Sequence, residues 1–109
     1  MSATRRSDAA RSALAARFKL LAEPVRLLIL EVLGGAELSV QEIVAATGLG
    51  QPHISRQLAL MASAGLLGRR KAGTRVYYSL KDESVTEWVE TADRDLRRHL
   101  EDQLGDLEE

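Results

Sequence analysis

The fold of this chain is decided by residues Leu38–Leu80, which read LSVQEIVAATGLGQPHISRQLALMASAGLLGRRKAGTRVYYSL. Ser39 followed by Glu42 is the pattern of a capping box, which predicts a helix that begins at Val40. Gly48 is suited to end that helix, because glycine adopts the left-handed conformation without steric cost. The start of the stretch therefore predicts one short helix with both ends specified.

A second helix and a hairpin follow within the same stretch. The helix is predicted from Gly50-Gln51-Pro52 to about Met61–Ala64, because proline in a first turn loses no needed amide hydrogen bond. Apolar and polar residues then alternate over Val76–Leu80, and this half-buried strand is expected to pair with Leu66–Lys71 across a turn at Gly73. Two short helices joined by a tight turn form a helix-turn-helix unit, and with a basic hairpin beside it the combination favours duplex DNA.

Three more helices are predicted outside this stretch. An alanine-rich first helix is expected to be capped by Asp8. Pro24 opens the next helix, which is apolar nearly all round and should be the spine of the core, and Gly34-Gly35 ends it. The last helix begins near Asp82 or Ser84. The predicted fold class is therefore mainly α with a small β-hairpin, a winged helix-turn-helix of about five helices and a two-stranded wing.

Composition describes one small domain. The 109 residues are 45% hydrophobic with a mean hydropathy of −0.16, and neither an internal repeat nor an interdomain linker occurs. We expect a disordered tail at residues 1–8, a winged helix-turn-helix domain at 9–105 with terminal dimerisation helices, and an acidic tail at 106–109. No run approaches the length of a membrane span, which favours a cytoplasmic protein without membrane contact.

The residue inventory argues against catalysis. The chain has no cysteine, which excludes disulfides, thiolate metal sites and a catalytic thiol. Its two histidines, His53 and His99, lie on predicted helices in other roles, and no set of acid, base and nucleophile groups accompanies them. We therefore expect neither an enzyme nor a cofactor.

Charge is divided sharply between the two ends of the chain. Residues 1–81 hold 12 Lys and Arg against 5 Asp and Glu, a net charge of +7, whereas residues 82–109 hold 3 against 11, a net charge of −8. The basic part suits a polyanion, and the acidic part should be repelled by one. A solvated acidic helix beside an ordinary basic domain is the simpler interpretation of the acidic part, and it stays open.

The second helix of the unit has one face for the core and another for solvent. Ile54, Leu58, Met61 and Ala62 recur at helical spacing and should be buried. Arg can pair with guanine O6 and N7 through two hydrogen bonds, and Gln can pair in the same way with adenine. The residues expected to contact DNA from this helix are Gln51, His53, Ser55, Arg56 and Gln57.

The hairpin carries the other expected DNA contacts. Four positive charges fall within seven residues, and no acidic residue occurs between Gly68 and Lys81, which favours a phosphate-contacting wing over a merely solvated turn. A glycine at the tip lets the turn bend closely, and a threonine hydroxyl can donate to a phosphate. The wing residues expected to contact DNA are Arg69, Arg70, Lys71, Thr74 and Arg75.

The last helix carries an apolar stripe, whose members recur at intervals of three or four from Val85 to Leu107. About twenty helical residues span roughly 30 Å, which is too long for one small core to cover. Packing on the parent domain is the alternative, but an uncovered stripe favours a contact between subunits. We expect a homodimer whose interface contains Leu14, Phe18, Leu21, Val85, Trp88, Val89, Ala92, Leu96 and Leu100.

Several segments resemble the ArsR/SmtB family of bacterial repressors. Leu21–Leu30, LAEPVRLLIL, resembles the opening motif of that family, and Gln51–Leu58, QPHISRQL, looks like its recognition helix. Ala64–Leu67 and Tyr77–Leu80 resemble its strand–wing–strand segment, so that the resemblance covers about residues 14–104. It implies a winged helix-turn-helix homodimer that acts as a repressor and leaves its operator on sensing a signal. A two-fold dimer should bind operator DNA that is an imperfect inverted repeat.

The metal ligands of that family are largely missing from this chain. Its arsenic and cadmium sensors use cysteines near the segment that here reads Glu37–Glu42, ELSVQE. The ligand positions of its zinc and nickel sensors are held here by Asp82, Ser84, Asp95 and Arg98, of which only Asp82 is retained. We therefore expect a regulator that lacks the usual metal site and whose effector is unknown. The alternative is a metalloregulator with an unorthodox site of Asp82, Asp95 and His99 on the last helix.

Overall fold

The computed structural model describes the backbone of residues 4–108 and the side chains of residues 4–105. Its elements are α1 (Asp8–Leu21), α2 (Pro24–Leu33), β1 (Leu38–Ser39), α3 (Val40–Thr47), α4 (Gln51–Ser63), β2 (Leu67–Ala72), β3 (Arg75–Leu80) and α5 (Ser84–Glu108). The predicted helices are all present within this range, and the predicted fold class, a mainly helical winged helix-turn-helix, is confirmed.

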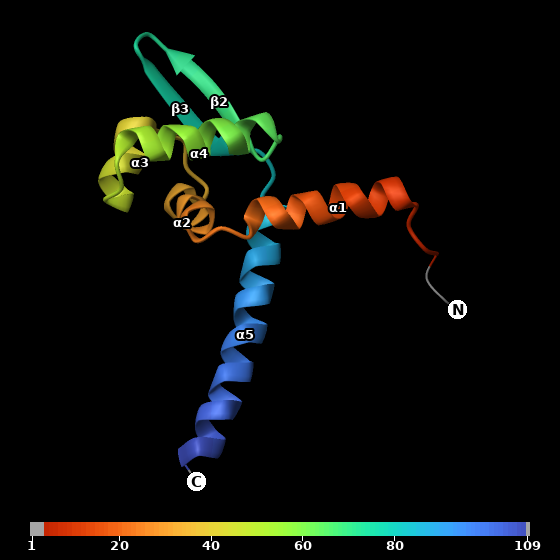
Figure 1. The fold of residues 1–109 in the computed structure, drawn as a ribbon. Coiled ribbons are helices and arrows are strands. Elements are labelled where there is room, and N and C mark those ends of the chain that lie inside the picture. The colour runs from red at the N-terminus through yellow and green to blue at the C-terminus, as the bar shows by residue number, and fades with distance from the viewer. Residues whose placement is uncertain (1–3, 109) are drawn as a thin grey trace.

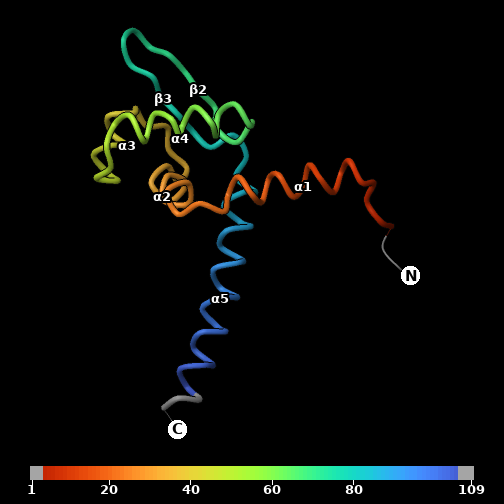
Figure 2. Tube along the Cα trace, in the orientation of Figure 1, coloured from red at the N-terminus to blue at the C-terminus, as the bar shows by residue number. Residues whose placement is uncertain are grey.

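The molecule consists of a head and two projecting helices. The head is formed by α2, α3, α4 and the sheet, while α1 and α5 leave it in different directions (Figure 1). The Cα trace shows most of α5 running alone below the head (Figure 2). The molecule accordingly measures 55 × 43 × 21 Å along its principal axes. Large parts of α1 and α5 are therefore not covered by this chain.

The core lies inside the head, where α4 packs against α2, α3 and the sheet. Ile54, Leu58 and Met61 are fully buried, as the helical spacing predicts, and Ala62 is half-buried at the edge. The buried apolar side chains are Leu21, Ile29, Leu30, Leu33, Ile43, Ile54, Leu58, Met61, Leu66, Leu67, Tyr78 and Val85. Helix α2, the predicted spine of the core, contributes three of them, and α4 contributes as many.

The start of α3 is capped as the sequence predicts. The backbone amide of Glu42 donates to Ser39 Oγ at 3.1 Å, and the amide of Ser39 donates to Glu42 Oε1 at 2.9 Å. The hydrogen bond from the Ser39 amide also lowers the pKa of the Glu42 carboxyl below its ordinary value. At the other end Gly48 is left-handed, with φ of 72°. Both predicted ends of α3 are confirmed.

The sheet has one strand more than the prediction. β1 pairs antiparallel with β3, placing Leu38 opposite Tyr78 and Ser39 opposite Tyr77, so that the strand order is β1-β3-β2. A strand of two residues has no alternation to detect, and its partner lies far along the chain. Because Ser39 pairs with β3 and also caps α3, this short strand attaches the wing to the helix-turn-helix.

The first and last helices differ from the predictions at one end each. The N-cap of α1 is Ser7 and not Asp8, because Ser7 has the extended backbone of a cap and its Oγ accepts from the Ala10 amide at 3.1 Å. Asp8 is already helical and pairs with Arg11. Helix α5 continues to Glu108, so residues 106–108 of the predicted acidic tail are helical. Among the described residues, no helix is both long and apolar enough to cross a membrane.

Candidate nucleic-acid interface

The predicted contact residues of α4 are divided between exposed and half-buried positions. Its N-cap is Gly50, and no side chain caps the first turn, so the amides of that turn stay free for an anion. The opposite side of the helix is held in the core by Ile54 and Leu58. Gln51 and Arg56 are exposed, whereas His53, Ser55 and Gln57 are half-buried.

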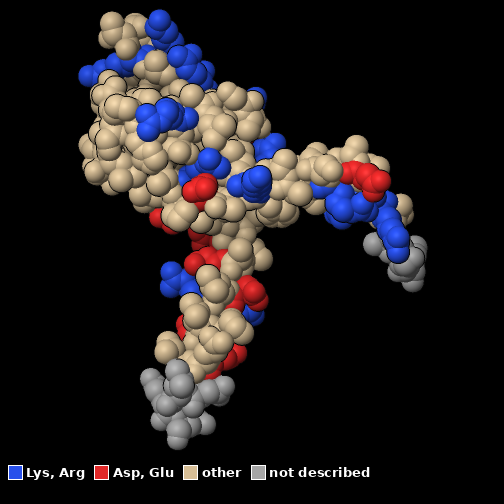
Figure 3. Space-filling view, in the orientation of Figure 1, with Lys and Arg blue, Asp and Glu red and all other residues tan. Residues whose placement is uncertain are grey.

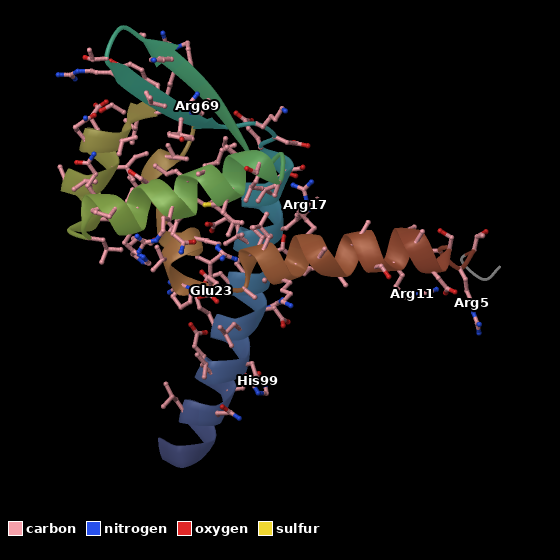
Figure 4. All side chains as sticks on the ribbon, turned by 45° about the horizontal axis from the view of Figure 1, so that its top comes forward. Arg5, Arg11, Arg17, Glu23, Arg69 and His99 are labelled. Carbon is pink, nitrogen blue, oxygen red and sulfur yellow. The ribbon has the colours of Figure 1, made fainter. Side chains whose placement is uncertain are left out.

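The β2–β3 hairpin is a basic projection beside α4. Lys and Arg atoms gather over it, whereas Asp and Glu atoms follow α5 (Figure 3). Gly73 forms its tip with φ of 63°, in the left-handed region that favours glycine. Arg69 lies opposite the buried Tyr78 and so shares the sheet face that covers the helices (Figure 4). The exposed residues of the predicted set are Arg69, Arg70, Lys71, Thr74 and Arg75.

Arg70 differs from the other cations of the wing because its guanidinium is already bound. It donates to both carboxylate oxygens of Glu37, at 2.7 to 3.1 Å, and lies 4.8 Å from the centre of the Tyr77 ring. The hydrogen bonds from Arg70 lower the pKa of the Glu37 carboxyl. The Tyr77 contact follows from the hairpin register, which sets these two residues opposite each other. No local pattern pointed to Glu37.

Arg26 makes a second contact that the sequence did not predict. This residue of α2 donates from Nε to Gln57 Oε1 at 2.9 Å, and from one terminal nitrogen to the carbonyl oxygen of Leu20 at 3.0 Å. Both hydrogen bonds are partly buried. A residue predicted to contact DNA, Gln57, is thus held from behind by another helix.

The predicted subunit interface is divided by the structure into exposed and buried members. Phe18, Trp88, Leu96 and Leu100 expose 55%, 44%, 54% and 47% of their surface, so they are available to a partner. Leu14 is at the margin of exposure, Val89 is half-buried and Ala92 is exposed. Leu21 and Val85 are a correction, because they expose only 8% and 2% and belong to the core of this chain. Both lie where α1 and α5 join the head, so their apolar side chains turn inward.

Two hollows flank the crossing of α1 and α5. One, of about 830 Å³, has three basic residues, Arg6, Arg17 and Lys81, and one acidic residue, Asp82, in its lining. The other, of about 540 Å³, lies between α2 and α5 and is lined by Phe18 and Trp88, whose ring centres are 6.5 Å apart. Its charged lining residues are Glu31, Glu90, Asp93 and Arg97. The two hollows therefore differ in charge.

The carboxylates at the positions aligned above with metal ligands make other contacts in the structure. Asp82 Oδ1 accepts from the Ser84 amide at 2.9 Å at the start of α5, which lowers the pKa of the Asp82 carboxyl. Asp95 lies 3.8 Å from the guanidinium of Arg98. Among the described residues, no group of three or more His, Asp or Glu side chains is placed to hold a metal ion.

The comparisons with known proteins agree with this architecture. The family described as "Bacterial regulatory protein, arsR family" matches residues 23–68, which span α2, the helix-turn-helix and the start of β2. The HTH-type transcriptional regulator Rv0081 of Mycobacterium tuberculosis is 34% identical over 93 residues, which cover 84% of this chain and 82% of that protein. The crystal structure of Rv0081 superposes with a TM-score of 0.79 at 32% identity, covering 90% of this chain and 99% of that one.

Two further relatives carry more specific names. A solution structure from Mycobacterium bovis is titled a homodimeric winged helix-turn-helix DNA-binding domain of a possible ArsR-family transcriptional regulator. It has a TM-score of 0.75 at 33% identity and covers 91% of this chain and 94% of that chain. The arsenic resistance transcriptional regulator ArsR1 of Pseudomonas putida is 43% identical over 74 residues, which cover 67% of this chain and 57% of that protein.

Proposed function

The chain belongs to the arsR family of bacterial regulatory proteins, and on that premise we propose that it is a dimeric, sequence-specific DNA-binding repressor whose operator is an imperfect inverted repeat. The observation that carries the proposal is the solvent-facing side of α4, beside a basic wing, on a head whose core is closed. A surface of this kind suits duplex DNA, because helix residues reach base edges while wing cations contact phosphates.

In this proposal α4 enters the major groove and provides the sequence-specific contacts. Arg56 is exposed and has no partner among the hydrogen bonds of the described side chains, so its guanidinium is free to pair with a guanine. Gln51 and Ser55 lie near the uncapped first turn, where phosphates bind favourably. His53 and Gln57 complete the reading face.

The wing supplies contacts that do not depend on sequence. We assign phosphate binding to Arg69, Lys71, Thr74 and Arg75, which are exposed on the hairpin. Arg70 has a different role, because its charge is matched by Glu37 and its plane lies over Tyr77. It joins the wing to Glu37, which directly precedes β1, and adds little to phosphate binding.

We propose that the subunits meet through α1 and the arm, which we define as residues 86–105 of α5. The support is the apolar side chains left exposed on both helices, together with a basic hollow on one side of their crossing and an apolar hollow with acidic residues on the other. A two-fold dimer would place two copies of α4 about one helical turn of DNA apart, roughly 34 Å. The interface residues are Leu14, Phe18, Trp88, Val89, Ala92, Leu96 and Leu100.

We also propose that no transition metal, cofactor or catalytic step takes part in this regulation. Asp82 already accepts a hydrogen bond from the Ser84 amide at the start of α5, and Arg98 places a cation where a ligand would be needed. Binding to chromosomal DNA would place the protein in the cytoplasm. No effector is assigned.

The proposal is tested by sequencing genomic DNA fragments captured by the purified protein. We expect one enriched inverted repeat, bound by a dimer and with an affinity that falls steeply as salt rises. The variant Arg94→Ala serves as a control and should capture the same repeat as the wild type. It removes a positive charge from α5 and not from the head. Fragments without a common motif would contradict sequence-specific binding.

A further inference from the structure

The guanidinium of Arg26 connects three helices within the head. Its Nε donates to Gln57 Oε1 on α4 at 2.9 Å, and a terminal nitrogen donates to the carbonyl oxygen of Leu20 in the last turn of α1 at 3.0 Å. Carbonyl groups in the last turn of a helix have no partner within that helix, so Leu20 offers a fixed acceptor. Because the guanidinium is planar, hydrogen bonds from two of its nitrogens to two acceptors define its position.

This arrangement decides which end of the Gln57 amide faces outward. A guanidinium has only donors, so it must face the oxygen of the amide and not the nitrogen. The Gln57 amide is therefore oriented with its oxygen, Oε1, toward Arg26. The group that Gln57 has left to offer on the reading face is its Nε2 amide, with two hydrogens to donate.

The consequence concerns base preference. A free glutamine pairs with adenine by donating to N7 while its oxygen accepts from N6. When that oxygen is directed toward an arginine behind the helix, the group that the amide has left for the DNA is its donor, although the oxygen keeps a second lone pair. A donor suits the O6 and N7 of guanine or the O4 of thymine. The sequence alone had suggested the adenine pairing for glutamine, and the contact with Arg26 works against it.

We infer that Arg26 is a positioning residue that sets the base specificity of this protein, by holding the Gln57 oxygen so that Gln57 reads a hydrogen-bond acceptor on the DNA. The inference rests on the proposed function. Arg26 itself is not a residue of the reading face, because it belongs to α2 and its guanidinium donates to α1 and α4.

The test compares base preferences of variants at every position of the captured operator. Gln57→Ala should lose preference at one base pair of each half-site. Arg26→Met keeps an apolar stem of similar length and should shift preference at that same base pair toward adenine, by about fivefold or more. The double variant should match Gln57→Ala at that position, because Arg26 acts only through Gln57.

Two controls separate this role from a general loss of structure. Arg94→Met removes one positive charge from α5 and should leave every base preference unchanged. Arg26→Lys keeps the charge but lacks the planar fork, so it should shift the same position toward adenine even if Arg26→Met folds poorly.

The results that overturn the inference are equally specific. An unchanged base preference in both Arg26 variants would overturn it, as would a loss of affinity spread evenly over all operator positions. Additive effects of the two substitutions in the double variant would also overturn it. If the wild-type protein captures no common motif, the proposed function fails and this inference fails with it, whereas a wild-type motif that the Arg26 variants share refutes the inference alone.

Discussion

The head and the arm treat their apolar side chains in opposite ways. In the head, Ile29, Ile54 and Leu58 are fully buried, whereas on the arm Leu96 and Leu100 keep 54% and 47% of their surface exposed. Their surface charges are also opposite, since the basic residues gather on the wing and the acidic ones follow α5 (Figure 3). The head buries its apolar side chains within one chain, while the arm leaves an apolar stripe that a second subunit can cover.

The largest expected effect comes from placing a charge on the arm. Leu96→Glu should raise the dissociation constant of the dimer by about 100-fold or more, because an unpaired buried charge costs roughly 3–5 kcal/mol. Sedimentation equilibrium measures this directly. Thr91→Glu is the matched control, since it adds the same charge beside the stripe and should leave the dimer intact. A wild-type protein that is monomeric at micromolar concentration would refute the assignment of the arm to an interface.

A smaller effect is expected from the reading face of the head. Arg56→Ala should weaken operator binding by about 1–3 kcal/mol and relax preference at one base pair, because it removes a two-point contact with guanine. Fluorescence anisotropy with operator variants gives both quantities. The dimer dissociation constant should not change, which separates the two regions. Operator binding equal to that of the wild type would exclude Arg56 as a base contact.

The two arginines of the wing should differ in their effect on salt dependence. Arg75→Ala should reduce the slope of log affinity against log salt by about one unit, since one phosphate contact is lost. Arg70→Ala should reduce it by clearly less, because the charge of Arg70 is already matched by Glu37 at 2.7 Å. The comparison uses binding isotherms at several salt concentrations. Equal slopes for the two variants would show that Arg70 leaves Glu37 and contacts phosphate.

The smallest expected effect is that of metals on the arm. Zinc, nickel, cobalt or cadmium at micromolar levels should leave operator affinity within about twofold. A metal that binds the DNA-bound and the free protein equally well does not change the equilibrium between them. Isothermal titration calorimetry and anisotropy test this together. Submicromolar zinc binding that disappears in Asp82→Ala, with release from DNA, would instead support the metalloregulator alternative.

Much of the head could be predicted because its signals are local. The capping box of Ser39 and Glu42, the left-handed Gly48 and the core spacing of Ile54 and Leu58 each involve residues within one or two helical turns. Interactions over that distance depend little on the rest of the chain. The interface prediction was wrong at Leu21 and Val85, which are buried in this chain, because periodicity identifies an apolar face but not the element that covers it.

The sequence by itself determined the helices, the hairpin, the buried face of α4 and the separation of basic and acidic surfaces, since these follow from short-range spacing and from composition. Only the tertiary structure decided which hydrogen-bond partners the individual polar side chains have. Arg70 meets Glu37 across 33 residues, and Arg26 meets Gln57 across 31. Which arginine finds a partner depends on strand register and helix packing, and these bring together residues whose sequence neighbours carry no sign of the contact. Tertiary structure therefore divides the basic residues into those with a partner in this chain, such as Arg26 and Arg70, and those that we propose bind DNA.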